Sequence, residues 1–197
     1  MMATIPKIIT IEGPNGAGKT TLTNAYSKLH PDVLCRLCVP DIYMDCHDMK
    51  SYMLFKASAL GSAFYFISGL IELKHQLNST NYTKILLDRS IWSTFAAAYS
   101  KDESSIIPLF GVLNEIKDYI NLPDKSVVLR ASYESCLKRI VQKQNGKEFD
   151  KDNIYSFNKK NEFYDILKDR GYDVFFIDTD MMDKNDVLSA FSKLELW

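Results

Sequence analysis

A glycine-rich run near the N-terminus carries the clearest chemical signal in this sequence. Residues 13–20 match the spacing G-x-x-x-x-G-K-[ST]. Glycines let a main chain curve tightly, so the amides of such a loop and the N-terminus of the following helix can face one anion. The pattern predicts a nucleotide-phosphate loop made by Gly13, Pro14, Asn15, Gly16, Ala17, Gly18, Lys19, Thr20 and Thr21. The alternative is a chance glycine-rich turn, but the apolar run before the motif and the helical pattern after it favour the phosphate loop.

Three side chains in and near this loop have the chemistry needed to hold a metal-bound triphosphate. Lys19 is expected to reach the β- and γ-phosphates of ATP, and the Thr20 hydroxyl is expected to bind Mg²⁺. Asp88 ends a later apolar run, which is where a carboxylate linked to Mg²⁺ is expected. ATP and Mg²⁺ are therefore the predicted cofactors. An ordinary helix-capping role is the alternative for Asp88.

Two further residues, Arg89 and Asp41, are candidates for the phosphoryl-transfer step itself. The planar guanidinium of Arg89 could bind an oxyanion or orient a carboxylate in the same cleft. Asp41 follows Val39-Pro40 and is expected to lie across from the γ-phosphate, where it would accept the proton of a hydroxyl. A surface ion pair for Arg89 and a turn position for Asp41 are the alternatives.

A basic helical pattern follows the fourth apolar run. Arg139 and Lys143 are four residues apart, so they share one face of a helix. A mobile lid near residues 139–152 could bring these charges over the phosphates and exclude water. A solvated charged surface is the alternative reading of the same residues.

These candidates need a scaffold that brings them together, and the apolar runs of the sequence predict one. Five short strand-like runs alternate with longer helical patterns. The strands are expected at 7–12, 33–39, 84–88, 126–131 and 173–178, and the helices at 19–29, 49–77, 107–120, 133–143, 153–170 and 184–194. This alternation predicts a single α/β domain over residues 1–197, with a parallel sheet and helices on both faces. Ligands bind beyond the carboxyl ends of such strands, which is where the candidates fall.

Bulk composition excludes several other classes of protein. The 197 residues carry a formal net charge of −1, which argues against an electrostatic grip on nucleic acid or on an anionic membrane. Four cysteines are too few for a disulfide framework, and no stretch reads as a secretory signal or a membrane span. We expect a cytoplasmic protein whose phosphate-binding charge is local.

Four segments resemble the thymidylate kinase and deoxynucleoside kinase superfamily of P-loop proteins. Residues 11–21 are similar to the thymidylate kinase opening, and Asp88-Arg89-Ser90 with Ser93 resembles the Asp/Glu-Arg-Ser/Tyr motif of both branches. Residues 129–140 look like the deoxynucleoside kinase strand and the helix that leads into its lid. Residues 175–179 are similar to the final strand and the loop that follows it near adenine.

The resemblance implies a P-loop NTPase fold, with a five-stranded parallel sheet in the order 2-3-1-4-5 and a helical lid. It implies ATP-dependent phosphoryl transfer to a small nucleoside or nucleoside monophosphate, with a pyrimidine deoxynucleoside or dTMP as the expected acceptor. Dimers are common in the superfamily, so a homodimer is expected. Lys19, Thr20, Asp88, Arg89, Asp41 and Arg139 take the roles described above.

The sequence departs from the superfamily pattern where the acceptor binds. Thymidylate kinases commonly place an arginine after the acid of the second strand, but Ile42 follows Asp41 here, and residues 64–68 lack the arginine of the next helix. Deoxynucleoside kinases use a glutamine of this helix for the base, and the one candidate here, Gln76, falls too close to the expected helix end. Aromatic residues could instead stack on a base or form core: Phe55, Phe64, Tyr65, Phe66 and Trp92. A non-catalytic or regulatory nucleotide-binding module is therefore the alternative function.

Overall fold

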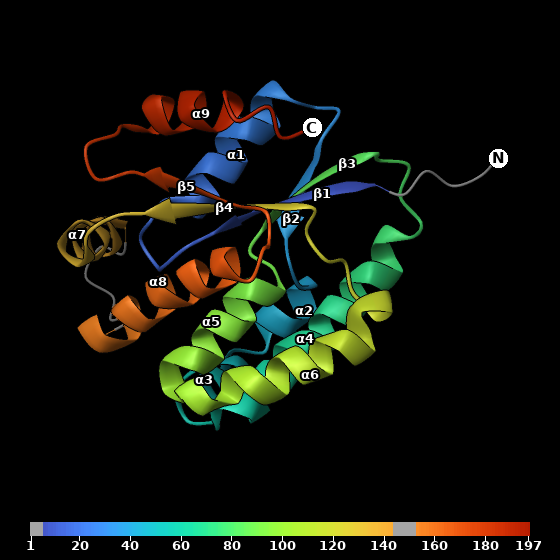
Figure 1. Ribbon diagram of the computed structural model, residues 1–197. Coiled ribbons are helices and arrows are strands. Elements are labelled where there is room, and N and C mark those ends of the chain that lie inside the picture. The colour runs from blue at the N-terminus through green and yellow to red at the C-terminus, as the bar shows by residue number, and fades with distance from the viewer. Residues whose placement is uncertain (1–5, 144–152) are drawn as a thin grey trace.

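A five-stranded parallel sheet forms the centre of the molecule (Figure 1). The computed structural model describes residues 6–143 and 153–197. Its strands run in the order β2-β3-β1-β4-β5, and every neighbouring pair is parallel. Their bounds are β1 Lys7–Glu12, β2 Leu34–Leu37, β3 Lys84–Asp88, β4 Lys125–Arg130 and β5 Val174–Asp178. The predicted sheet and its predicted order are confirmed.

Helices cover both faces of this sheet (Figure 1). Helices α1 (Lys19–Leu29) and α9 (Lys184–Ser192) lie on one face. The other face carries α4 (Ala59–Leu77), α5 (Ile91–Lys101), α6 (Ile106–Ile116) and α8 (Ile154–Asp169). The remaining helical elements are α2 (Asp41–Asp45), α3 (His47–Phe55), α7 (Tyr133–Lys143) and the short 3₁₀ turns Glu103–Ser105 and Lys117–Tyr119.

The central strands β1, β3 and β4 are largely apolar because both of their faces are buried. In β4, Val127 and Leu129 pack in the cluster beneath α1 and α9, whereas Val128 points to the opposite cluster of α4, α5, α6 and α8. Successive side chains of a strand point to opposite faces, so each central strand contributes to both cores. This arrangement fixes the carboxyl ends of β1, β3 and β4 side by side, where the functional candidates begin.

Three helical regions differ from the sequence-based expectation, and the first is the short helix α2 (Asp41–Asp45), where no helix is predicted. No helix is predicted between residues 88 and 107, yet α5 occupies Ile91–Lys101. Eight of its eleven residues are buried, so it lacks the broad polar face that marks a surface helix. The single helix predicted over 49–77 is divided into α3 and α4. The break lies at Ser58, whose side chain accepts a hydrogen bond from the Gly61 amide and so caps a new helix.

The predicted lid near 139–152 falls only partly within the described residues. Its first residues, 139–143, form the end of α7, and residues 144–152 lie outside the described part of the chain. No helix in the described ranges has the length and apolar character needed to cross a bilayer. The lid and the single-domain organisation stay predictions.

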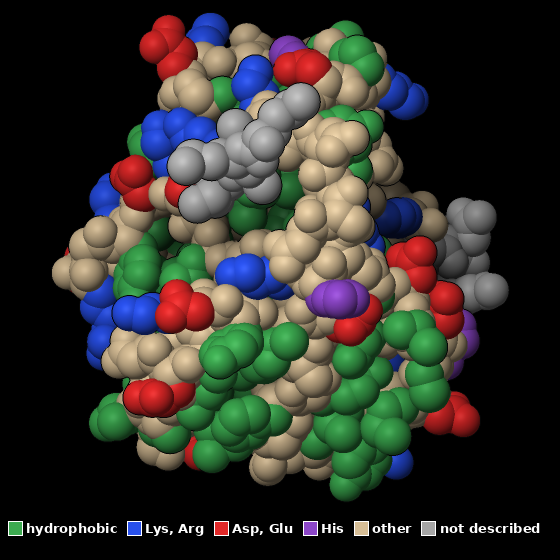
Figure 2. All heavy atoms as spheres, turned by 90° about the vertical axis from the view of Figure 1, so that its right-hand side faces the viewer, with side chains coloured by type: hydrophobic (Ala, Val, Ile, Leu, Met, Phe, Trp, Pro, Cys, Tyr) green, Lys and Arg blue, Asp and Glu red, His purple; other side chains and the backbone are tan. Residues whose placement is uncertain are grey.

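One face of the molecule gathers hydrophobic side chains over its lower part, while charged side chains of both signs are scattered above them (Figure 2). Large hydrophobic residues are also exposed on helices below the sheet, including Tyr52 of α3, Phe64 and Ile71 of α4 and Ile107 of α6. A homodimer remains a prediction.

The burial of the central strands indicates which truncated side chain should lower the stability of the protein most. Leu86 in β3 is fully buried, whereas Leu29 at the end of α1 is 63% exposed. We expect Leu86→Ala to lower the free energy of unfolding by about 2–5 kcal/mol, because a cavity remains in a packed core. The matched control, Leu29→Ala, should change it by less than about 0.5 kcal/mol. Urea unfolding followed by circular dichroism measures both, and equal losses would contradict this description of the core.

Candidate active site

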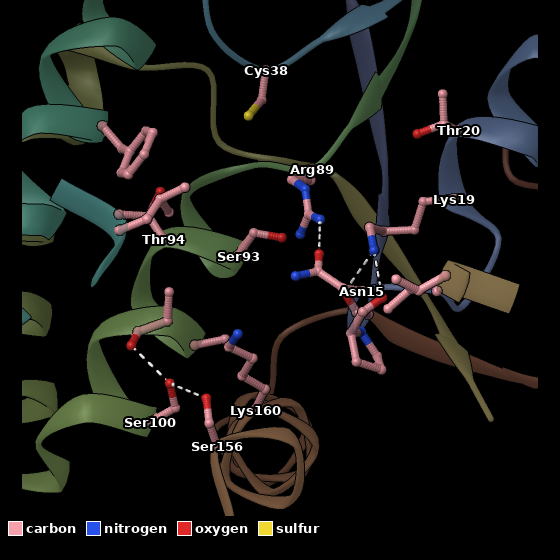
Figure 3. A pocket seen from close by; sticks show the side chains of 18 of the residues that line it. Asn15, Lys19, Thr20, Cys38, Arg89, Ser93, Thr94, Ser100, Ser156 and Lys160 are labelled. Carbon is pink, nitrogen blue, oxygen red and sulfur yellow. Dashed lines mark hydrogen bonds between the residues drawn. The ribbon is translucent and has the colours of Figure 1, made fainter. Parts of the chain in front are cut away.

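A cleft of about 1430 Å³ opens at the carboxyl ends of the central strands. The glycine-rich loop between β1 and α1 forms one wall, and residues of α4 and α5 line the other. Between them, Arg89 and Ser93 face the loop residue Asn15 and the side chain of Lys19 (Figure 3). The structure thus brings the predicted phosphate loop and a second, separate wall into one cavity.

The loop is wound so tightly that two of its glycines have no room for a side chain. Gly13 and Gly16 have φ angles of 127° and 84°, in a region that L side chains rarely adopt. A Cβ at Gly13 would lie 2.3 Å from the Leu129 carbonyl oxygen in β4, and one at Gly16 would lie 2.4 Å from the Cys136 carbonyl oxygen in α7. The loop is therefore wedged between β4 and α7, with most of its residues lining the cleft; Ala17 is buried behind it.

Lys19 is the first residue of α1, and its side chain folds back beneath the loop. Its Nζ donates hydrogen bonds to the carbonyl oxygens of Gly13 at 2.9 Å and Pro14 at 2.6 Å. Burial, and then the nearby Arg89 guanidinium, lower the pKa of Lys19 to about 7. A phosphate group in the loop would supply the missing negative charge and favour the ammonium form. The buried cation is thus placed to respond to an anionic ligand.

Thr20 and Asp88 come together at the end of β3, as a shared metal site would require. The Thr20 hydroxyl donates to Asp88 Oδ2 at 2.6 Å. Asp88 Oδ1 is buried and has no hydrogen-bond partner in the described part of the chain. Buried carboxylate oxygens are normally satisfied, so an unpartnered one beside a phosphate loop fits a cation. The two residues suit the Mg²⁺ that a nucleotide triphosphate carries.

Arg89 has an uncommon backbone conformation that directs its side chain into the cleft. Its φ of 76° lies in the left-handed region, which non-glycine residues rarely adopt. The Arg89 amide donates to the Ile11 carbonyl oxygen at 2.9 Å, and its guanidinium donates to Asn15 Oδ1 at 2.7 Å (Figure 3). Such conformations persist where surrounding structure enforces them, often at functional sites. Arg89 is therefore fixed beside the loop.

The predicted position of Asp41 at the cleft is wrong. Strand β2 ends at Leu37, so Leu37, Cys38 and Val39 line the cleft in the place expected for the acid. Buried Pro40 then leads into α2, and Asp41 begins that short helix with an exposed side chain that does not line the cavity. The catalytic role of Asp41 stays a prediction without support from its position.

The basic residues of α7 reach the cleft in different ways. Arg139 and Lys143 both line it, and Lys143 is exposed at the end of the helix. The Arg139 guanidinium donates to the carbonyl oxygen of Thr179 at 2.6 Å and to its hydroxyl at 3.1 Å. Thr179 follows β5, in the loop that resembles the adenine side of the superfamily. Arg139 is thereby held against that loop.

Two candidates for binding the base lie elsewhere. Gln76 accepts a hydrogen bond from Arg36 at 3.3 Å and donates one to Glu72, and it does not line the cleft. Trp92 is 2% exposed and belongs to the core. Of the five aromatic residues considered above, Phe55 and Phe66 line the cavity, where Met44 and Leu54 add apolar surface.

The structure adds site residues that the sequence did not single out as such. Ser90, Ser93 and Tyr164 line the cleft around the buried carboxylate of Glu12, the last residue of β1. Lysines from three helices also line it: Lys50 of α3, Lys101 of α5 and Lys160 of α8. The sequence held one signal for Glu12, because it is the one carboxylate of strand β1 and stands directly before the loop. The lysines and Tyr164 gave no such signal, since only the packing of α3, α5 and α8 brings them to the cavity.

A family model named "Deoxynucleoside kinase" matches residues 9–191, nearly the whole sequence. The chain belongs to the deoxynucleoside kinase family. This membership supports a nucleoside kinase that uses ATP, generally with Mg²⁺. No match was found among curated protein sequences.

Solved structures of related kinases share the fold. The thymidylate kinase of Candida albicans matches with a TM-score of 0.71 and 18% identity, over 96% of this chain and 91% of its own. Deoxyadenosine kinase from M. mycoides with bound dATP gives 0.71 and 18% over 95% and 98% of the two chains. The same enzyme with products dCMP and a flexible dCDP bound gives 0.69 and 18% over 95% and 97%. The P-loop kinase fold predicted for this deoxynucleoside kinase family member is confirmed.

The close approach at Gly16 generates a direct test of the loop. We expect Gly16→Ala to weaken ATP binding more than about tenfold, because its Cβ would collide with the α7 backbone and its φ angle would be strained. The control is Gly111→Ala in α6, where an added Cβ meets no atom within 4 Å and the helical conformation suits alanine. Calorimetric titration with ATP compares them. Wild-type affinity in Gly16→Ala would contradict the geometry of the loop.

Proposed function

We propose that this chain transfers the γ-phosphoryl group of ATP to a pyrimidine deoxynucleoside or to dTMP. The observation that carries the proposal is one cavity that joins a phosphate loop to a second wall with apolar and hydroxyl-bearing side chains. The second wall includes Phe66, Ser62 and Thr94. Apolar pockets with a few polar groups are typical of sites that orient small ligands. The size of about 1430 Å³ leaves room for two substrates together.

The charge of the cleft supports polyphosphate substrates. Among its described lining residues there are seven cationic side chains and no carboxylate, although the whole chain carries a net charge of −1. The cations are Lys19, Lys50, Arg89, Lys101, Arg139, Lys143 and Lys160. A cavity of one sign concentrates ligands of the opposite sign and strengthens their binding. These seven residues form the local positive charge that a phosphate-binding protein needs when its net charge is close to zero.

In this proposal the residues near the loop have different roles in phosphoryl transfer. Lys19 and Arg89 hold the phosphates, and Thr20 with Asp88 holds Mg²⁺, which neutralises charge on the β- and γ-oxygens when bound. Arg139 and Lys143 neutralise charge from the lid side, with residues near 139–152 as the proposed lid of a single domain. Apolar surface from Phe55, Phe66 and Met44 receives the acceptor base.

The choice between the two acceptor types follows from the departures noted in the sequence. Neither Ile42 nor the α4 residues 64–68 supplies an arginine for a 5′-phosphate. The family membership also supports a nucleoside. Lys50 and Lys101, however, line the same cavity and could meet a phosphate. We therefore propose a deoxynucleoside as the preferred acceptor and dTMP as the second choice.

A non-catalytic nucleotide-binding module is the second candidate, and one observation favours it. Asp41 lies off the cleft, and no carboxylate lines the described part of the cavity. A module that only binds nucleotide needs no proton acceptor. It would bind ATP with Mg²⁺ and transfer nothing.

Labelled ATP separates the two candidates. The purified chain is incubated with γ-labelled ATP, Mg²⁺ and each of the common deoxynucleosides and deoxynucleoside monophosphates. The proposal predicts labelled product with thymidine, deoxycytidine or dTMP above the purine acceptors. ATP binding without labelled product from any acceptor would establish the second candidate. Faster transfer to a purine deoxynucleoside would overturn the pyrimidine preference.

Lys19→Ala tests the role of the loop lysine in this reaction. We expect kcat to fall at least about 100-fold, because a preorganised charge at the transferring phosphoryl group is withdrawn. Lys138→Ala is the control, since Lys138 lies on α7 with an exposed side chain outside the cleft lining. Initial rates of ADP release with the preferred acceptor give both values. A Lys19→Ala rate within threefold of wild type would contradict the proposed role.

A further inference from the structure

A hydroxyl acceptor must lose a proton during phosphoryl transfer, yet the described lining of the cleft offers no carboxylate to receive it. The lining does contain hydroxyl groups close to the phosphate loop. Ser90 is the residue before α5, and Ser93 lies in its first turn. Both hydroxyls contact the same acid, which is hidden one layer behind the cavity wall.

That acid is Glu12, the last residue of β1, whose exposed fraction is 0%. Its Oε1 accepts a hydrogen bond from the Ser90 hydroxyl at 2.5 Å, and its Oε2 accepts a short one from the Ser93 hydroxyl. The Tyr164 hydroxyl lies 3.4 Å from Glu12 Oε2 and 3.4 Å from Ser93 Oγ. Glu12 therefore touches the cavity only through side chains that line it.

Ser93 is the member of this cluster best placed to meet an acceptor. It lines the cleft, and its hydroxyl points toward Arg89 in the space opposite Asn15 and Lys19 (Figure 3). An acceptor hydroxyl that attacks a phosphorus held by Lys19 and Arg89 must enter this space. Serine can accept one proton and donate its own at the same time, because its hydroxyl is both an acceptor and a donor.

We propose that Glu12 receives the proton of the acceptor hydroxyl through Ser93. The acceptor oxygen forms a bond to the γ-phosphorus, and the bond from that phosphorus to the β–γ bridging oxygen breaks, its electron pair leaving with ADP. The acceptor proton passes to Ser93 Oγ while the Ser93 proton passes to Glu12 Oε2. After product release the proton returns to solvent by the same route in reverse.

The surroundings of Glu12 suit a proton acceptor more than a passive structural carboxylate. Burial raises the pKa of Glu12, and hydrogen bonds from Ser90 and Ser93 and the charge of Arg89 act in the opposite direction. The other titratable groups that interact with it are Lys19, Cys38 and Tyr164. A more basic carboxylate takes a proton more readily, and the charge of Arg89 favours the ionised form of Glu12.

The inference rests on the proposed function, since it needs an acceptor with a hydroxyl group. The test compares Glu12→Gln, Asp41→Asn and wild type in steady-state transfer to the preferred deoxynucleoside. Glutamine keeps the size of Glu12 and one of its two accepting oxygens but cannot take the proton. We expect kcat of Glu12→Gln to fall about 100-fold. The KM for ATP should stay within threefold, and Asp41→Asn should lower kcat less than Glu12→Gln does, because Asp41 lies outside the cleft lining.

A pH profile separates proton transfer from a purely structural role. Wild-type kcat should fall at low pH as Glu12 becomes protonated, and this acidic limb should be absent in Glu12→Gln. Ser93→Ala supplies a second test that leaves Glu12 in place, with an expected loss in kcat of tenfold or more. Ser105→Ala is its control, because Ser105 is a buried serine outside the cleft lining.

The contradicting outcomes are distinct from failure of the proposed function. A wild-type enzyme that phosphorylates a deoxynucleoside while Glu12→Gln and Ser93→Ala keep kcat within threefold would overturn the proton path. A large loss in Asp41→Asn with none in Glu12→Gln would assign the proton to Asp41 instead. Transfer to dTMP with none to any nucleoside would also overturn it, because the attacking phosphate oxygen has no hydroxyl proton to lose. Absence of transfer to every acceptor would refute the proposed function itself.

Discussion

The close approach of the phosphate loop to β4 and α7 is the constraint on which the rest of the site depends. The loop backbone passes so near Leu129 and Cys136 that positions 13 and 16 leave no space for a Cβ. This contact sets how far the loop stands from the ends of the strands, and hence where its amides can point. It also fixes α7, so that Arg139 meets the loop after β5.

The same tight winding gathers charged groups beneath the loop that would be costly if left uncompensated. Glu12, Lys19 and Asp88 are all buried, at 0%, 5% and 3% exposure. Ionised groups in such surroundings require partners, and here Ser90, Ser93 and Thr20 provide hydrogen bonds while Lys19 uses main-chain carbonyls. Within the part of the chain that the structure describes, Lys19 lacks an anionic hydrogen-bond partner, and one carboxylate oxygen of Asp88 has no partner. Both features fit a triphosphate with its metal ion.

Much of this fold could be predicted because the signals are local. The glycine spacing at 13–18 and the apolar runs of β1, β3 and β4 carry their own patterns, and the alternation of strands and helices restricts the topology. Helix α5 was missed because most of its residues are buried, which leaves no broad polar face of the kind that marks a surface helix. Asp41 was misplaced because the end of β2 was set two residues late, and a shift of that size moves a side chain from the cleft to solvent.

The second wall of the cleft could not be predicted from sequence for a different reason. Lys101 belongs to α5, and Lys160 and Tyr164 belong to α8, two helices that are far apart in the chain. Their convergence depends on packing between those helices, which no short pattern encodes. Gln76 has the residue type that could bind a base, but it lies at the end of α4. There it pairs with Arg36 and not with a ligand in the cleft.

Binding of a bisubstrate ligand tests most directly whether the cleft takes two substrates at once. Such a ligand joins adenosine to thymidine through five phosphates, and its affinity is measured calorimetrically alone and in the presence of excess ATP or excess thymidine. We predict that it binds more tightly than ATP and that either substrate weakens its binding. An affinity equal to that of ATP, weakened by ATP and unchanged by thymidine, would show that the second wall receives no deoxynucleoside.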